Sequence, residues 1–79
     1  MTTATKIYAL TSAYGPSLEV RCKPYKDNQM DCEVYEIKNG LSNMYLGLFT
    51  IRMYSLRKQV LSAAIKKFSP AFDHLQGAV

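Results

Sequence analysis

SLEVRCKPYKDNQMDCEVYEI, residues 17–37, is the stretch of this sequence that decides its fold. Apolar and polar residues alternate over 18–23 and again over 30–35, which is the pattern of two strands that each bury one face. A short loop at residues 26–28, with Asn28 in the left-handed conformation, joins them as a hairpin. The register that follows matches apolar with apolar and basic with acidic residues: Val20 with Val34, Cys22 with Cys32, Arg21 with Glu33, and Lys23 with Asp31. Because a one-residue slip would turn one apolar set to the wrong face, we predict this register.

A strand is expected before the hairpin, at residues 6–13. Gly15-Pro16 is a turn signal, and a two-residue turn there connects this strand to Ser17. Strand alternation then gives one set of residues to each face: Ile7, Ala9, Thr11 and Ala13 to the buried face, and Tyr8, Leu10 and Tyr14 to the opposite one.

A fourth strand is expected at residues 43–54, after the hairpin signal Asn39-Gly40. Its alternation leaves two alternatives. A tight turn gives one set to the buried face (Tyr45, Gly47, Phe49, Ile51 and Met53), whereas a longer loop through Leu41-Ser42 exchanges the two faces.

A helix follows, with Ser55 as the expected N-cap. Its apolar residues recur at helical spacing: Leu56, Val60, Leu61, Ala64, Ile65 and Phe68. Ser69-Pro70 ends this helix and opens a short second helix, which Gly77 terminates. The predicted fold is therefore a single α+β domain over residues 1–79: an antiparallel sheet of about four strands, one main helix packed on one face, and a short C-terminal helix.

Composition places the chain among small folded proteins. Its 79 residues are 48% hydrophobic, which is too apolar for a disordered chain and too short for two cores. The formal charge of +4 lies entirely in residues 41–79. The first ten residues lack the pattern of a secretory signal, and no apolar run is long enough to cross a bilayer. With only two cysteines, the sequence favours a reducing cytoplasmic setting.

No catalytic or cofactor motif is present in the sequence, so we expect no enzyme activity, no metal and no small-molecule substrate. His74 is the only histidine, and two cysteines with one histidine fall short of a structural zinc set. Cys22 and Cys32 are expected to be buried thiols, with a cross-strand disulfide or redox pair as the alternative. The carboxylates Asp31 and Glu33 are matched with basic residues, which indicates an ordinary sheet surface.

The sheet face opposite the helix is the expected working surface. The fourth strand is apolar on both sides, and such strands are normally covered on both sides. Tyrosine, arginine and aliphatic residues on that face are types enriched at binding hot spots. The predicted partner-binding residues are Tyr25, Tyr35, Ile37, Met44, Leu46, Leu48 and Arg52. The alternative is that residues 70–79, through Phe72 and Leu75, fold back over this face and cover it.

Three functions remain open at this point, and the first is a non-enzymatic protein-binding module: a homodimer, an inhibitor of a larger complex, or both. In general build, a compact sheet plus one helix without catalytic groups, the chain resembles small phage-encoded inhibitors, anti-CRISPR proteins among them. That resemblance implies a viral protein acting on a host complex in the host cytoplasm, and it assigns no residue.

The second function is nucleic-acid binding. Its phosphate contacts would come from four basic residues: Arg57, Lys58, Lys66 and Lys67. Tyr8 through Gly15-Pro16, and Ser55-Leu-Arg-Lys before Ala63-Ala64, resemble parts of the double-stranded-RNA-binding domain. The leading helix of that domain is missing here, and a fourth strand is added. The third function is a small thiol redox protein that uses Cys22 and Cys32.

Overall fold

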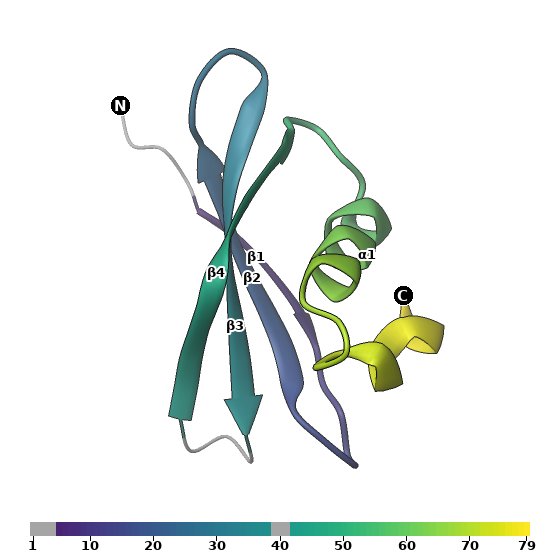
Figure 1. Ribbon diagram of the computed structural model, residues 1–79. Helices are drawn as coiled ribbons and strands as arrows, with labels where there is room; N and C mark the ends of the chain where they lie inside the picture. The colour runs from purple at the N-terminus through teal and green to yellow at the C-terminus, as the bar shows by residue number, and fades with distance from the viewer. Residues whose placement is uncertain (1–4, 39–41) are drawn as a thin grey trace.

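A computed structural model describes residues 5–38 and 42–79. They form an antiparallel four-stranded sheet in the order β1-β2-β3-β4, followed by a helix and a short 3-10 helix (Figure 1). The bounds of these elements are β1 Lys6–Leu10, β2 Ser17–Pro24, β3 Gln29–Lys38, β4 Ser42–Arg52, α1 Arg57–Lys67 and η1 Asp73–Ala78. The expected small α+β domain is confirmed at this level.

The central hairpin has the register that the sequence predicts. All four expected pairs of β2 and β3 face each other: Val20 and Val34, Cys22 and Cys32, Arg21 and Glu33, Lys23 and Asp31. Asn28 takes the left-handed conformation, with φ 57°, and the Gln29 N–H donates to the carbonyl of Lys26 to close the turn. The prediction holds because pattern, charge and turn chemistry all favour one pairing.

The prediction for β1 is wrong in its length and its faces. The strand ends at Leu10, and six residues (11–16) connect it to β2 in place of a two-residue turn. A hydrogen bond from the Ser12 N–H to Ser17 Oγ, 3.0 Å, spans this connection. Leu10 therefore pairs with Leu18, so that Leu10 and Tyr8 lie on the helix side and Ile7 and Ala9 on the other. The longer connection buries a leucine where the tight turn would have buried an alanine.

A bulge in β4 makes both sequence alternatives true, each for one half of the strand. Gly47 pairs with Val34 but Tyr45 pairs with Tyr35, so Leu46 is an extra residue. Gly47, Phe49 and Ile51 consequently face the helix side, whereas Tyr45 faces away from it. The turn at Asn39-Gly40 lies outside the described residues.

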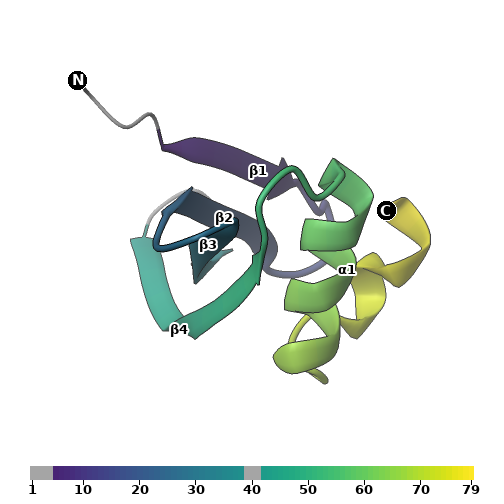
Figure 2. The ribbon, with the colours of Figure 1, turned by 90° about the horizontal axis from the view of Figure 1, so that it is seen from above.

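Helix α1 covers one face of the sheet (Figure 2). Its buried residues Val60, Leu61, Ala64 and Ile65 share one core with Leu18, Val20 and Val34. The N-cap is Leu56, not Ser55: the Leu56 N–H donates to Gln59 Oε1 at 2.7 Å, and the Ser55 hydroxyl bonds back to the carbonyl of Arg52. Leu56 itself is exposed rather than part of the apolar stripe.

The C-terminal residues pack beside α1, on the same side of the sheet (Figures 1 and 2). Phe72 and Leu75 are buried in the common core, so the alternative in which they cover the opposite face is wrong. The helical segment begins at Asp73 rather than Pro70, it is a 3-10 helix, and Gly77 lies inside it. His74 Nε2 lies 2.9 Å from the carbonyl oxygen of Pro16, which ties this segment to the β1–β2 connection.

Candidate protein-binding surface

The outer face is the sheet face opposite α1, and no described element covers it (Figure 2). The strand registers place these residues on it: Ile7 and Ala9 from β1; Glu19, Arg21 and Lys23 from β2; Asp31, Glu33, Tyr35 and Ile37 from β3; Tyr45, Leu48, Thr50 and Arg52 from β4. Charged residues lie in the middle of this face, on β2 and β3, and apolar residues lie on both outer strands, β1 and β4. The outer face is therefore more polar than the sequence predicts.

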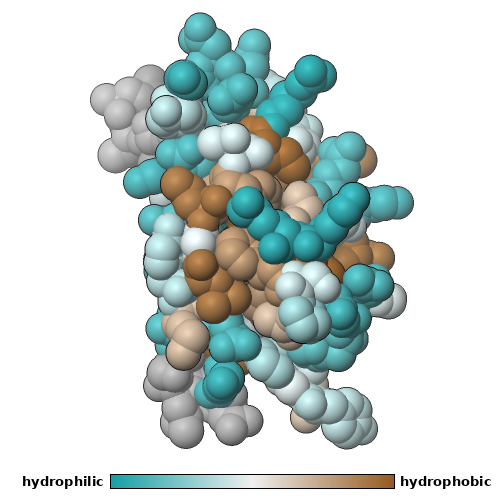
Figure 3. All heavy atoms as spheres, viewed as in Figure 1, coloured by the Kyte–Doolittle hydropathy of each residue, from teal (hydrophilic) through white to brown (hydrophobic). Residues whose placement is uncertain are grey.

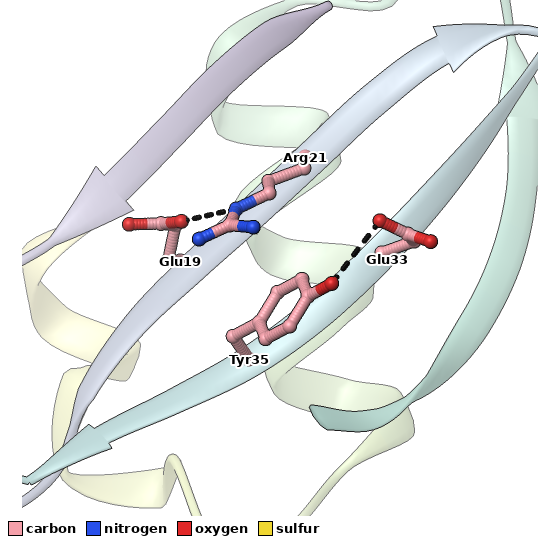
Figure 4. Close-up of polar contacts among 4 residues, drawn as sticks. All are labelled: Glu19, Arg21, Glu33 and Tyr35. Atoms are coloured by element: carbon pink, nitrogen blue, oxygen red, sulfur yellow. Dashed lines mark hydrogen bonds and ion pairs between the residues drawn. The ribbon is translucent and has the colours of Figure 1, made fainter. Parts of the chain in front are cut away.

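A four-residue polar network lies at the centre of the outer face (Figure 4). Arg21 Nε donates to Glu19 Oε2 at 2.5 Å, and the Tyr35 hydroxyl donates to Glu33 Oε1 at 3.2 Å. The Arg21 guanidinium carbon lies 4.3 Å from the centre of the Tyr35 ring, a cation–π contact. The hydrogen bond to Glu19 raises the pKa of Arg21, while desolvation and the nearby Glu33 charge raise the pKa of Tyr35. The network fixes the orientation of the Tyr35 ring.

An apolar strip adjoins this network on β4. The rings of Tyr35 and Tyr45 meet edge to face, 5.5 Å between centroids, and Tyr45 remains 53% exposed. Leu48 is 46% exposed and lies opposite Glu33. Hydrophobic side chains gather over β4 in the space-filling view, where this strand faces the viewer (Figure 3). Large apolar side chains are thus exposed where the sheet ends.

The backbone edge of β4 is also open. Among the described residues, β4 pairs with β3 on one side and with nothing on the other. Ten of its residues, 42–51, carry no charge. An unpaired strand of this length presents N–H and C=O groups that another chain can pair with, and charged residues are the usual protection against it. At the opposite edge, Arg57 donates to the Ala9 carbonyl at 2.9 Å, so that one backbone acceptor of β1 is already hydrogen-bonded.

Five of the seven predicted partner-binding residues lie on or beside the outer face. Tyr35, Ile37, Leu48 and Arg52 are on it, and Tyr25 is exposed in the adjoining hairpin loop. The other two predicted residues, Met44 and Leu46, do not lie on this face.

Met44 and Leu46 differ from the sequence prediction because of the bulge. Met44 pairs with Glu36 on the helix side of the sheet, although it stays exposed, and Leu46 packs partly against the core. Tyr8 packs against the core and Leu10 belongs to it, so both are also lost from the expected surface.

Tyr45 is the residue that sequence reasoning missed. The tight-turn alternative placed it in the core, and only the longer-loop alternative turned it outward. The sequence contains no local signal for the bulge that switches the faces within β4, because a bulge needs no particular residue at the extra position.

Helix α1 carries four basic residues. Lys58, Lys66 and Lys67 are exposed, and α1 contains no acidic residue. Arg57 is also exposed but is engaged with the Ala9 carbonyl. Arg57 and Lys58 lie in the first turn of α1, and Lys66 and Lys67 lie in its last turn.

The two cysteines lie side by side in the core. Cys22 and Cys32 are 1% and 0% exposed, and their Sγ atoms are 2.9 Å apart. The hydrogen bond with Cys22, together with burial, raises the pKa of the Cys32 thiol. Among the residues with described positions, no three His, Cys, Asp or Glu side chains lie together as a metal-binding group.

No family model, curated protein or solved structure matches this chain. Within residues 5–38 and 42–79, no helix is both long and apolar enough to span a membrane.

Proposed function

We propose that this protein is a non-enzymatic binding module that docks a protein partner on β4 and the adjoining part of the outer face. The observation that carries the proposal is the edge of β4. Among the described residues this strand is paired on one side only, it carries no charge over residues 42–51, and its Tyr45 and Leu48 side chains are exposed. A partner strand added to this edge would gain backbone hydrogen bonds, and the apolar side chains would supply specificity.

The side chains beside the edge support the same function. Tyrosine and arginine are the residues most enriched at binding hot spots, and here Tyr35 is oriented between Arg21 and Tyr45 before any partner arrives. A preoriented aromatic side chain loses less conformational entropy on binding than a mobile one. The general build resembles small phage inhibitors, so a larger host complex and a second copy of this chain are the two partner classes that we propose.

The test compares Leu48→Glu with Leu56→Glu. Both replace an exposed leucine by a charge, but Leu48 lies on the apolar strip and Leu56, 64% exposed, lies at the start of α1 on the other side of the sheet. Self-association is measured by sedimentation, and partner binding by co-purification from the native host. We expect Leu48→Glu to weaken binding by more than about tenfold, the effect of losing a hot spot, and Leu56→Glu to leave it unchanged.

Folding is checked in the same samples by circular dichroism. Equal binding by both variants, with both folded, would contradict the proposed surface. Leu46→Glu is unsuitable for this purpose because Leu46 packs against the core, and its replacement is expected to destabilise the fold.

A second candidate function is nucleic-acid binding through α1. The observation that favours it is the absence of any acidic residue on α1 beside the exposed Lys58, Lys66 and Lys67. Binding of this kind weakens steeply with salt, because phosphate contacts release counterions. A gel shift at low salt that disappears in Lys66→Glu, but persists in Leu48→Glu, would support it. No shift at low salt would end it.

A further inference from the structure

Cys22 and Cys32 lie close enough together to form a disulfide, and the proposed partner binding does not involve them. Cys22 and Cys32 are directly opposite on the antiparallel strands β2 and β3. Opposite residues of such strands have Cα atoms about 4.5 or 5.5 Å apart, and both distances fall within the range that a disulfide spans. The Sγ atoms, at 2.9 Å, need to approach by about 0.9 Å to form the bond. No backbone rearrangement is required.

A pocket reaches one of the two cysteines. It has a volume of about 130 Å³ and lies on the helix side of the sheet, and its lining residues are Lys6, Cys22, Pro24, Met30, Met53 and Tyr54. This volume holds several water-sized molecules, so hydrogen peroxide fits. Cys32 does not line the pocket. The two thiols therefore differ in access although both are buried.

We infer that Cys22 and Cys32 form a reversible intramolecular disulfide, with Cys22 as the thiol that reacts first with peroxide from the pocket. The Cys22 thiolate attacks one oxygen of hydrogen peroxide, the O–O bond breaks, and hydroxide leaves, which gives Cys22 sulfenic acid. The Cys32 sulfur then displaces hydroxide from the Cys22 sulfur and loses its own proton. Two thiols and one peroxide thus yield one disulfide and two waters. An external dithiol reverses the reaction by thiol–disulfide exchange.

The surroundings of Cys22 favour its role as the first nucleophile. Lys6 lies opposite Cys22 in the β1–β2 register and lines the same pocket. The hydrogen bond between the two sulfurs and the positive charge of Lys6 lower the pKa of Cys22 against the opposing effect of burial. Because the thiolate is the reactive form, these contacts raise the rate at Cys22 and leave Cys32 as the resolving thiol.

The experiment treats the reduced protein with hydrogen peroxide, removes the peroxide with catalase, unfolds the chain and alkylates the free thiols. Trypsin then cuts after Arg21, Lys26 and Lys38, which puts Cys22 on peptide 22–26 and Cys32 on peptide 27–38. We expect these peptides to be joined by a bond that dithiothreitol breaks. Peptides are measured because Met30 and Met53 also line the pocket, and their sulfoxides would confuse an intact mass.

Single variants assign the order of the two steps. Cys32→Ser is expected to stop at Cys22 sulfenic acid, which dimedone traps, whereas Cys22→Ser should leave Cys32 at least roughly tenfold slower to react. Lys6→Gln should slow disulfide formation roughly two- to fivefold, because an exposed charge contributes modestly. The inference is overturned if both thiols remain alkylatable, if the linked peptides come from two molecules, or if Cys32 reacts as fast as Cys22. None of these three outcomes depends on whether a partner binds β4.

Discussion

Gly47 offers the sharpest test of the packing that shapes the candidate surface. Gly47 lies beside the β4 bulge, where the Phe68 ring packs against the strand. A Cβ atom at this position would lie 2.8 Å from Phe68 Cζ and 2.9 Å from Phe68 Cε1, closer than real Cβ atoms approach other carbons. Gly47→Ala must therefore displace the ring or the strand.

The expected loss can be bounded. Overpacking of this kind lowers the free energy of unfolding by about 1–3 kcal/mol. The φ of 159° at Gly47, which L side chains rarely adopt, removes the gain that alanine otherwise brings by restricting the unfolded chain. With a urea dependence of about 1 kcal/mol per molar for a chain of this size, the unfolding midpoint should fall by roughly 1–3 M.

Two further variants make this prediction refutable. Gly77→Ala is the matched control, because nothing lies within 4 Å of the added carbon. It should leave the midpoint unchanged or raise it slightly, because alanine restricts the unfolded chain by about 0.4–1 kcal/mol at a position without strain. In a Phe68→Leu background the clashing ring atoms are gone, so Gly47→Ala should cost at least about 0.5 kcal/mol less than it does beside Phe68. The cost that remains comes from the φ of 159° at Gly47. If Gly47→Ala unfolds at the same urea concentration as Gly77→Ala, or if the two effects simply add, the close approach of Phe68 is not what requires glycine here.

Three other predictions concern the elements that hold the sheet and helix together. Leu61→Ala should lower the free energy of unfolding by about 2–5 kcal/mol, because Leu61 is fully buried, whereas Ser62→Ala on the exposed side should change it by less than about 0.5 kcal/mol; urea unfolding measures both. Asn28→Ala should cost about 1–2 kcal/mol because φ is 57°, while Asn28→Gly should be tolerated; a loss common to both would point to the Asn28 side chain instead. Gln59→Ala removes the acceptor of the Leu56 N–H and should cost about 0.5–1 kcal/mol, with faster amide exchange in the first turn of α1; unchanged exchange would show that this bond does not hold the helix end.

The sequence predicts the face for some residues of the candidate surface, and only the packed structure sets it for others. Tyr35 and Leu48 were correctly placed from the sequence, because the hairpin register and the alternation of β4 beyond the bulge put them outward. Tyr45, Met44 and Leu46 were not, because their faces depend on where the bulge falls. A bulge at this point lets the strand pass beneath Phe68 and still pair with β3, which is a property of the packed structure.

The sequence by itself determined the hairpin of β2 and β3 and the buried side of α1. In both, a local periodicity agrees with local chemistry: charge pairs and Asn28 in the hairpin, and the spacing of Val60, Leu61, Ala64 and Ile65 in the helix. Nothing from the rest of the chain was needed to choose between alternatives.

The tertiary structure alone decided the face of β1, the bulge in β4 and the course of the C-terminal residues. The sequence left two arrangements open for β4 and for the C-terminal residues, and the single arrangement that it predicted for β1 was wrong. In β1 and in the C-terminal residues, the structure buries large side chains: Leu10 beside Leu18, and Phe72 and Leu75 beside α1. Burial of apolar area depends on contacts between residues far apart in sequence, so no local pattern contains that information. The edge of β4 is open because the core residues are buried without any described segment covering that edge.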